Sequence, residues 1–133
     1  MSSKAVGARA GGLPEQFAFG DGLVGLPEFR TFSVRPVDDA RVVELECIEE
    51  PEFGVVAAAA DMVRPGMTDE LADRGLVGPG ERLWVLLAVH GDPPVMTANL
   101  CGPLVVGPDG VARQLVLEDP VYELRAPIAP VAG

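Results

Sequence analysis

The order of apolar and polar positions along this chain predicts a protein built almost entirely of short β-strands. Side chains alternate between two faces in residues 29–34, 42–48 and 111–118, which is the period of a strand with one buried face. Residues 53–60 and 83–90 are apolar throughout, as is typical of strands that are buried on both faces. The expected strands are residues 17–19, 29–34, 42–48, 53–60, 83–90, 95–106, 111–118 and 121–124.

The longest of these strands is 95–106, with the sequence V-M-T-A-N-L-C-G-P-L-V-V. Gly102 and Pro103 predict a bend in it, because proline has no N–H for the ladder and glycine has no side chain to pack. It follows strand 83–90 after a short turn, so the two are expected to pair in antiparallel fashion. Its one strongly polar side chain, Asn99, is expected to satisfy the backbone where the bend interrupts the ladder; binding a ligand is the alternative.

One helix is expected, at residues 68–74, which makes the fold class all-β and mainly antiparallel. Thr68 is a suitable cap, and Gly75 is a suitable stop. Pro36 is expected to end the strand at residues 29–34. Many short strands and one short helix predict a small closed or partly closed β-barrel. Residues 15–130 form the single expected domain, and residues 1–14, rich in glycine and alanine, are expected to be a flexible tail.

The net charge of the chain limits the kinds of partner that it is expected to bind. The chain of 133 residues has 20 acidic and 10 basic residues and a net charge of −10, which disfavours direct binding to nucleic acid or to anionic lipid surfaces. Such a charge suits a basic protein partner, or it serves only to keep the protein soluble. With no apolar run of membrane-spanning length and no secretory signal, a cytoplasmic location is expected.

The residues that usually carry catalysis or bind metals do not form a recognisable set. His90 is the only histidine, and Cys47 and Cys101 are far apart in the sequence, so neither a nucleophile–base pair nor a zinc site is expected. The two cysteines are expected to be buried free thiols, with a disulfide between them as the alternative. The glutamates between 44 and 52 lack the order of a calcium loop and are read as a solvated face. No phosphate-binding glycine loop is present, so no enzyme activity and no cofactor are expected.

The apolar loop around Leu23, Val24 and Leu26 needs a reason to be apolar, since loops are usually built from polar turn residues. Its leucines either plug the end of a barrel or are displayed to a partner. The acidic residues Glu49, Glu50 and Glu52 form the other candidate contact region. We expect exposed parts of these two regions to carry partner contacts.

Four segments together resemble the FliW family of flagellar assembly factors. They are M-T-A-N-L at 96–100 with Pro103 and L-V-V behind it, F-G-D-G-L-V-G-L at 19–26, E-P-E-F-G-V-V at 50–56, and Q-L-V-L-E-D at 114–119 with Tyr122, Arg125 and Pro127. The resemblance covers residues 17–128, and its clearest signature is Met96, Thr97, Asn99 and Pro103. Gly20 and Val24 replace prolines that are common in the family, Leu26 replaces an aromatic residue, and the usual first strand is not evident.

The resemblance implies a non-enzymatic, barrel-like cytoplasmic protein that binds flagellin. It also implies binding to CsrA, a small basic RNA-binding repressor, so that release from flagellin leads to antagonism of CsrA. The alternative function is a small-ligand-binding β-barrel whose cavity is lined from strands 83–90 and 95–106; such a barrel needs an unfilled interior.

Overall fold

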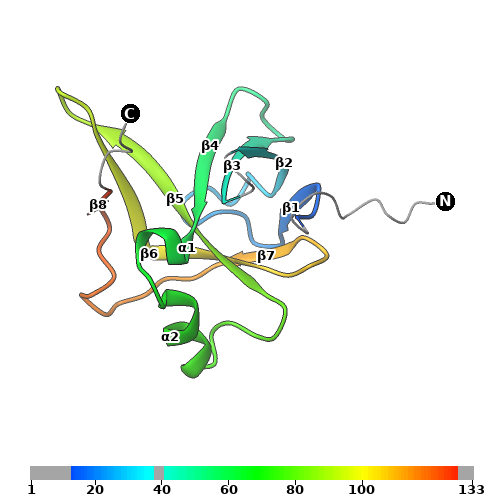
Figure 1. Ribbon diagram of the computed structural model, residues 1–133. Helices are drawn as coiled ribbons and strands as arrows, with labels where there is room; N and C mark the ends of the chain where they lie inside the picture. Colours follow the sequence, from blue (N-terminus) through cyan, green and yellow to red (C-terminus); the bar gives the residue numbers. More distant parts are fainter. Residues whose placement is uncertain (1–12, 38–40, 129–133) are drawn as a thin grey trace.

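Seven strands close on themselves in this chain, as the computed structural model shows for residues 13–37 and 41–128 (Figure 1). The seven strands of the ring are β1 (Gln16–Phe19), β2 (Thr31–Val37), β3 (Val42–Cys47), β4 (Gly54–Ala59), β5 (Arg82–His90), β6 (Val95–Val106) and β7 (Val111–Gln114), and an eighth strand is β8 (Ala126–Pro127). The helices are α1 (Ala60–Val63) and α2 (Met67–Asp73).

The strand order confirms the predicted antiparallel barrel. The sheet runs β5-β4-β3-β2-β1-β7-β6, and β6 pairs again with β5, which closes the ring. All these pairs are antiparallel except β1 with β7, which is parallel. Each strand of the ring is paired on both sides over part of its length, and the short β8 pairs with the part of β6 that β7 leaves free.

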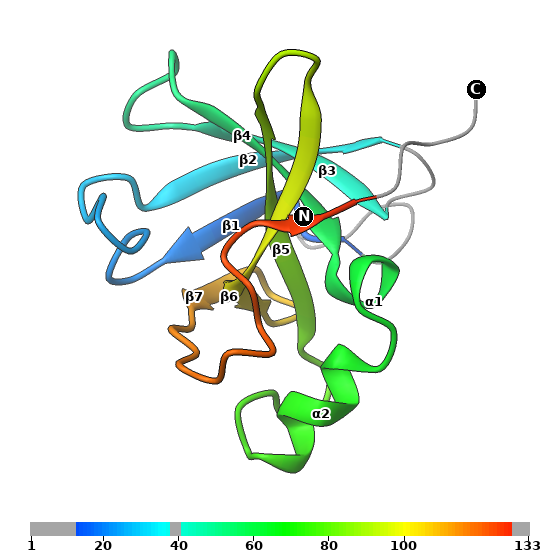
Figure 2. The ribbon, with the colours of Figure 1, turned by 90° about the vertical axis from the view of Figure 1, so that its left-hand side faces the viewer.

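Strand β6 is bent where the sequence predicts it. Trp84 of β5 lies opposite Leu104, but Leu86 lies opposite Asn99, so residues 100–103 form a bulge in the ladder. After the bend β6 pairs with β7, and before it β6 pairs with β8. The β5–β6 hairpin projects beyond the barrel (Figures 1 and 2), and Met96 near its tip is 44% exposed.

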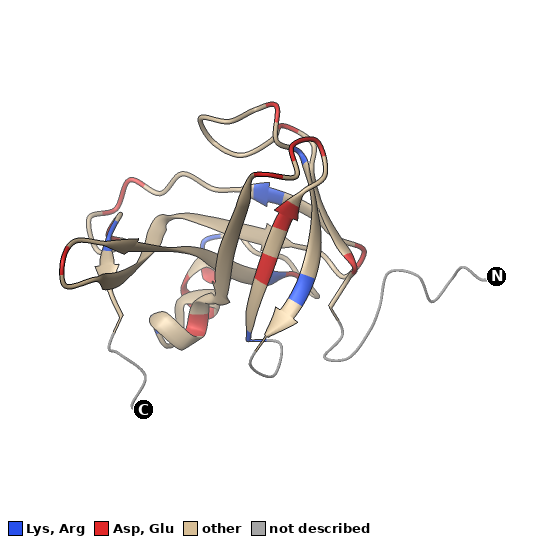
Figure 3. Cartoon of the chain, turned by 90° about the horizontal axis from the view of Figure 1, so that it is seen from above, with Lys and Arg blue, Asp and Glu red and all other residues tan. Residues whose placement is uncertain are grey.

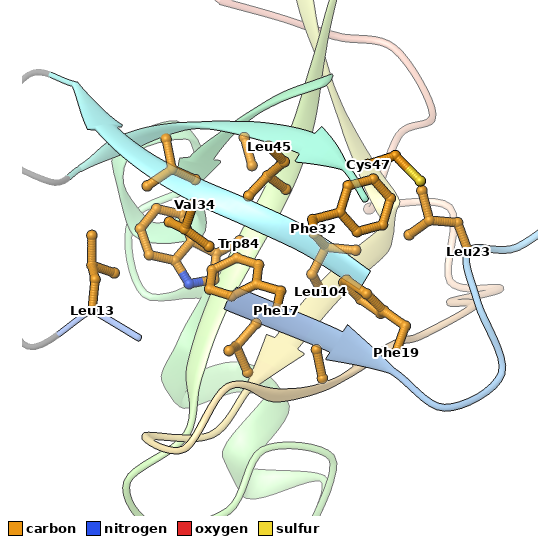
Figure 4. Packing of buried hydrophobic residues seen from close by; sticks show 14 residues of the cluster. Leu13, Phe17, Phe19, Leu23, Phe32, Val34, Leu45, Cys47, Trp84 and Leu104 are labelled. Carbon is orange, nitrogen blue, oxygen red and sulfur yellow. The ribbon is translucent and has the colours of Figure 1, made fainter. Parts of the chain in front are cut away.

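Side chains fill the interior of the barrel (Figure 4). Phe17 packs against Trp84 with ring centroids 6.1 Å apart, and Phe19 meets Phe32 edge to face at 5.8 Å. All four aromatic residues are almost fully buried. Four of the seven aromatic residues of the chain thus lie buried in the barrel interior, where large rings bury the most apolar area.

A second apolar cluster lies outside the barrel, where α1, α2 and the C-terminal segment cover β5 and β6. Leu83 and Val85 belong to this outer cluster, whereas Trp84 between them points into the barrel. This double burial explains the continuous apolar run in the first half of β5. The prediction of burial on both faces is wrong for the rest of the run, since Val89 is 63% exposed, and wrong also at the start of β4, where Gly54 is exposed.

The helical region differs from its prediction in two ways. Ala60 begins a separate helix, α1, instead of ending a strand, and its side chain is buried in the outer cluster. Thr68 does not cap α2: the N-cap residue is Gly66, and the Thr68 N–H donates to Asp61 Oδ1 at 2.8 Å. Asp61 of α1 therefore accepts a backbone N–H from the first turn of α2. The predicted stop is confirmed, since Gly75 follows α2 with φ +78°.

Pro36 lies inside β2 and does not end it. Val34 donates its backbone N–H to the carbonyl of Glu15, just before β1 begins. Pro36 faces the same edge of β2 as Val34 but lies two residues beyond it, where β1 no longer runs alongside. No ladder partner is available there, so the missing N–H of proline is tolerated.

The last two predicted strands are also changed. The strand expected at 111–118 ends at Gln114, although the N–H groups of Leu115 and Leu117 still donate to carbonyls of Pro103 and Cys101, at 2.8 and 2.7 Å. Residues 121–124 are not a strand. The Tyr122 N–H donates to the Asp119 carbonyl and closes a turn. The strand that pairs with β6 is β8 instead.

Residues 1–12 of the expected tail lie outside the described residues. Leu13, which the sequence assigned to that tail, is 1% exposed and packs in the barrel interior near Trp84 (Figure 4).

Candidate functional site

The two regions predicted to bind a partner lie at the same end of the barrel. Residues 20–30 connect β1 to β2, and residues 48–53 connect β3 to β4 (Figure 2). The backbone N–H groups of Arg30 and Thr31 both donate to Glu49 Oε1, at 3.2 and 2.9 Å. Phe29 stacks on Phe53 with ring centroids 4.6 Å apart. We call this end of the barrel, formed by residues 20–30 and 48–53, the loop end.

The apolar loop divides into a buried and a displayed part. Leu23 is 5% exposed and lies beside Cys47 at the end of the barrel (Figure 4), so it plugs the interior. Leu26 is half-buried against the same cluster. Val24 between them is 59% exposed. Of the three residues, Val24 is the one whose side chain is exposed.

A tight turn produces this display. The Leu26 N–H donates to the Leu23 carbonyl at 2.9 Å, and the two residues form an isolated bridge. Gly22 enters the turn with φ +71°, and a Cβ on it would lie 2.4 Å from the carbonyl oxygen of Pro27. Only glycine fits at this position.

Glu49 has a structural role that its neighbours in the acidic turn do not share. Its carboxylate accepts the N–H of Thr31, and this bond is the main cause that lowers the pKa of Glu49 to about 2; the N–H of Arg30 lowers it further. The thiol of Cys47 also donates to Glu49 Oε1, at 3.4 Å, and burial raises the pKa of that thiol. Glu49 thus fastens the turn to the start of β2. Glu50 and Glu52 are exposed.

The acidic turn continues onto an acidic face of the sheet. Glu44 and Glu46 alternate with buried residues along β3, as predicted for a solvated face, and Figure 3 shows the acidic positions on this strand and on the connection after it. A groove of about 450 Å³ runs across this face and is lined by these two glutamates, Arg35 and Glu52, among others. Arg35 pairs with Glu44. Three carboxylates against one guanidinium leave the groove with an excess of negative charge.

The signature segment of β6 lies next to the loop end. Asn99 Oδ1 accepts the backbone N–H of Gly102 at 2.9 Å and the thiol of Cys101 at 3.2 Å. This confirms the prediction that Asn99 satisfies the backbone at the bend. Thr97 and Pro103 are buried.

Gln114 is a residue that the sequence analysis did not single out. Its Oε1 accepts the N–H of Val24 at 2.8 Å, and its Nε2 donates to the carbonyl of Gly102 at 2.8 Å. Gln114 therefore joins the apolar loop to the bent strand. No sequence signal reveals this link, because Val24 and Gln114 are 90 residues apart.

The residues considered for catalysis do not come together. His90 lies opposite Val95 near the tip of the β5–β6 hairpin, whereas Cys101 lies in the bulge of β6. Both cysteines are free thiols, Cys47 buried and Cys101 half-buried. Within residues 13–37 and 41–128, no group of three or more histidine, cysteine or carboxylate side chains is arranged to hold a metal ion.

The alternative of a ligand cavity inside the barrel fails on packing. The inward faces of β5 and β6 contribute Trp84 and Leu104, and both side chains are buried in the interior cluster. The space that a ligand would need is occupied by protein. Among the described helices, none is long and apolar enough to cross a membrane.

Comparisons with known proteins agree with this architecture. The family model described as FliW protein matches residues 1–128. A solved structure described as the crystal structure of the flagellar assembly factor FliW superposes with a TM-score of 0.66 and 21% sequence identity, covering 87% of this chain and 86% of that one. A search of curated proteins found no match.

Proposed function

Because this chain belongs to the FliW family, we propose that it is a non-enzymatic flagellar assembly factor of the cytoplasm that binds flagellin and, when free of flagellin, antagonises a CsrA-type translational repressor. The observation that carries the proposal is the family match, which spans residues 1–128. In this mechanism the two partners exchange on one chain, so that export of flagellin frees the chain to act on the repressor.

The loop end supplies the contact surface in this proposal. Val24 offers an exposed apolar side chain on a loop held by a tight turn. Glu50 and Glu52 offer exposed carboxylates on the β3–β4 connection at the same end of the barrel. Leu23, Leu26 and Glu49 contribute indirectly, since their side chains hold the loop and the acidic turn in place.

Charge supports the assignment of a basic partner. The chain has a net charge of −10, and the groove on β3 carries more carboxylates than guanidinium groups. Opposite charge accelerates encounter with a basic repressor. Once bound, an acidic chain weakens RNA binding either by occupying basic surface or by placing a repulsive field near the RNA site. In the first route RNA and the chain cannot bind the repressor together, whereas in the second they can bind together with reduced affinity.

Calorimetric titration of the full chain with flagellin and with the CsrA-type protein from the same cell tests the proposal. We expect measurable binding to each partner, and displacement of one by the other. Val24→Asp should weaken binding at the loop end. Val111→Asp is a matched control, since Val111 is 62% exposed on β7, away from the loop end.

A charge reversal tests the acidic surface separately. The double variant Glu50→Lys, Glu52→Lys should weaken binding to the basic partner, and the weakening should shrink at high salt as charges are screened. If the unchanged chain binds neither protein, the proposed function is wrong. If Val24→Asp and Val111→Asp bind both partners equally well, the loop end is not the contact surface.

A further inference from the structure

The side-chain amide of Gln114 forms a bridge between two parts of the chain that the sequence treats as unrelated. Gln114 is the last residue of β7 and is half-buried. Its oxygen accepts the N–H of Val24, and its nitrogen donates to the carbonyl of Gly102, both at 2.8 Å. A primary amide is suited to this position because it has a donor and an acceptor at one end of the side chain.

The anchor point of this bridge is itself fixed. The N–H of Gly102 donates to Asn99 Oδ1 at 2.9 Å. A Cβ on Gly102 would lie 2.9 Å from Asn99 Nδ2 and 2.9 Å from Gln114 Nε2, so both amides pack closely over the glycine. The orientation of the Gln114 side chain is therefore determined by the bend in β6.

The other end of the bridge is the tip of the apolar loop. Gly22 and Gly25 flank Leu23 and Val24 with positive φ, and the buried Leu23 holds one side of the turn. Val24 points away from the interior and is 59% exposed, so packing does not fix it. Its backbone N–H is held by Gln114 instead.

We propose that Gln114 is a positioning residue for the partner-binding loop: it fixes the exposed side chain of Val24 by holding its backbone N–H against the bend of β6. The proposal rests on the proposed function, in that Val24 is taken as a partner contact. Gln114 itself need not touch the partner. A loop whose tip is already ordered loses less conformational freedom on binding, and this raises affinity without a new contact.

Amide hydrogen exchange in the full chain, free of partner, tests the positioning. Gln114→Met keeps the length of the side chain and removes both hydrogen bonds. The Val24 N–H should then exchange about tenfold faster, while the N–H of Leu104 inside the ladder should change little. Gln114→Glu keeps an oxygen that can accept the Val24 N–H but loses the donor to the Gly102 carbonyl, so it should restore part of the protection of Val24. If Gln114 only stabilised the fold as a whole, Gln114→Glu would not restore the protection of the Val24 N–H in particular. Val111→Ala on the same strand serves as the control.

The outcomes separate this inference from the proposed function. Unchanged exchange of Val24 in Gln114→Met overturns the positioning role. If Val24→Asp weakens flagellin or CsrA binding but Gln114→Met does not, the positioning role is also overturned. If the unchanged chain binds neither protein, the proposed function is wrong, whereas the exchange of Val24 still decides whether Gln114 holds the loop.

Discussion

The side-chain oxygen of Asn99 accepts the backbone N–H of Gly102 at a distance of 2.9 Å. In a regular strand this N–H would donate to a neighbouring strand, but the bulge at residues 100–103 removes it from the β5 ladder. A side chain three residues away thus replaces a backbone acceptor. The bend in β6 is stable because the polar group that it frees is paired again.

Replacing Asn99 by alanine should therefore destabilise the fold. Asn99→Ala leaves the N–H of the buried Gly102 without this acceptor, and the expected loss is about 1–3 kcal/mol in the free energy of unfolding. Urea denaturation measures it. Asn99→Asp is the matched variant, because a carboxylate oxygen still accepts the N–H, and it should retain most of the stability. Equal stability of Asn99→Ala and the unchanged chain would rule out this role.

Gly102 is expected to tolerate no side chain. In Gly102→Ala the new Cβ must displace the amides of Asn99 and Gln114, which lie 2.9 Å from its position. The hydrogen bonds of both amides to Gly102 are then weakened, so we expect a loss of about 2 kcal/mol or more in the free energy of unfolding. Gly20→Ala is the control, because a Cβ at Gly20 meets no atom within 4 Å. Similar thermal denaturation of the two variants would contradict the expectation.

Much of the fold could be predicted from sequence, because the period of buried positions depends on local alternation. Strand β3 follows its pattern, with Val43 and Leu45 buried and Glu46 exposed. The errors occur where a distant segment decides the outcome. Pro36 is tolerated in β2 because β1 does not extend alongside it, and β8 forms at Ala126 because β6 offers its free edge there. Neither circumstance is visible in the local sequence.

The candidate site was predictable to the extent that its partners are near in sequence. Asn99 is three residues from Gly102, so its role could be inferred from the adjacent Gly-Pro bend. Glu49 cannot be distinguished from Glu50 by sequence. It differs because the barrel brings the N–H of Thr31, 18 residues away, to its carboxylate. Gln114 was missed for the same reason.

Tyr122 should stabilise the packing of the C-terminal segment on the helices. Its hydroxyl donates to Glu70 Oε1 at 2.9 Å, and Glu70 also accepts from Arg64 Nε at 3.0 Å. The Arg64 guanidinium is the main cause that lowers the pKa of Glu70, and it lies 5.2 Å from the centroid of the Tyr122 ring. Tyr122→Phe keeps the ring and removes the hydroxyl, and we expect it to cost about 1–2 kcal/mol in the free energy of unfolding.

A double-mutant cycle isolates this contact. Tyr122→Phe and Glu70→Gln should lose less stability together than the sum of the two single losses, because both remove the same charge-assisted bond. Glu118→Gln, which removes an exposed carboxylate of the same C-terminal segment, controls for the change in net charge. Additive losses in denaturant titrations would show that Tyr122 and Glu70 are not coupled.

Glu49 should make the stability of the chain depend on pH in the acidic range. Its pKa is about 2 in the folded chain, because the N–H groups of Thr31 and Arg30 stabilise the carboxylate, whereas an unfolded glutamate has a pKa of about 4.3. The unfolded chain therefore binds a proton first as the pH falls. The stabilisation by Glu49 is fully present above about pH 4.5 and is lost progressively as the pH falls toward about 2.

Glu49→Gln provides the test, because the amide oxygen still accepts the two N–H groups but carries no charge. The unchanged chain should exceed this variant in free energy of unfolding at pH 6, and the difference should shrink between pH 4.5 and pH 2, as measured by urea denaturation at each pH. Glu50→Gln removes a charge from the same turn and should show a smaller difference at pH 6. A difference between the chain and Glu49→Gln that stays constant from pH 6 to pH 2 would mean that these hydrogen bonds do not depend on the ionised carboxylate. The junction would then be held by uncharged hydrogen bonds and by the contact between Phe29 and Phe53, whose ring centroids are 4.6 Å apart.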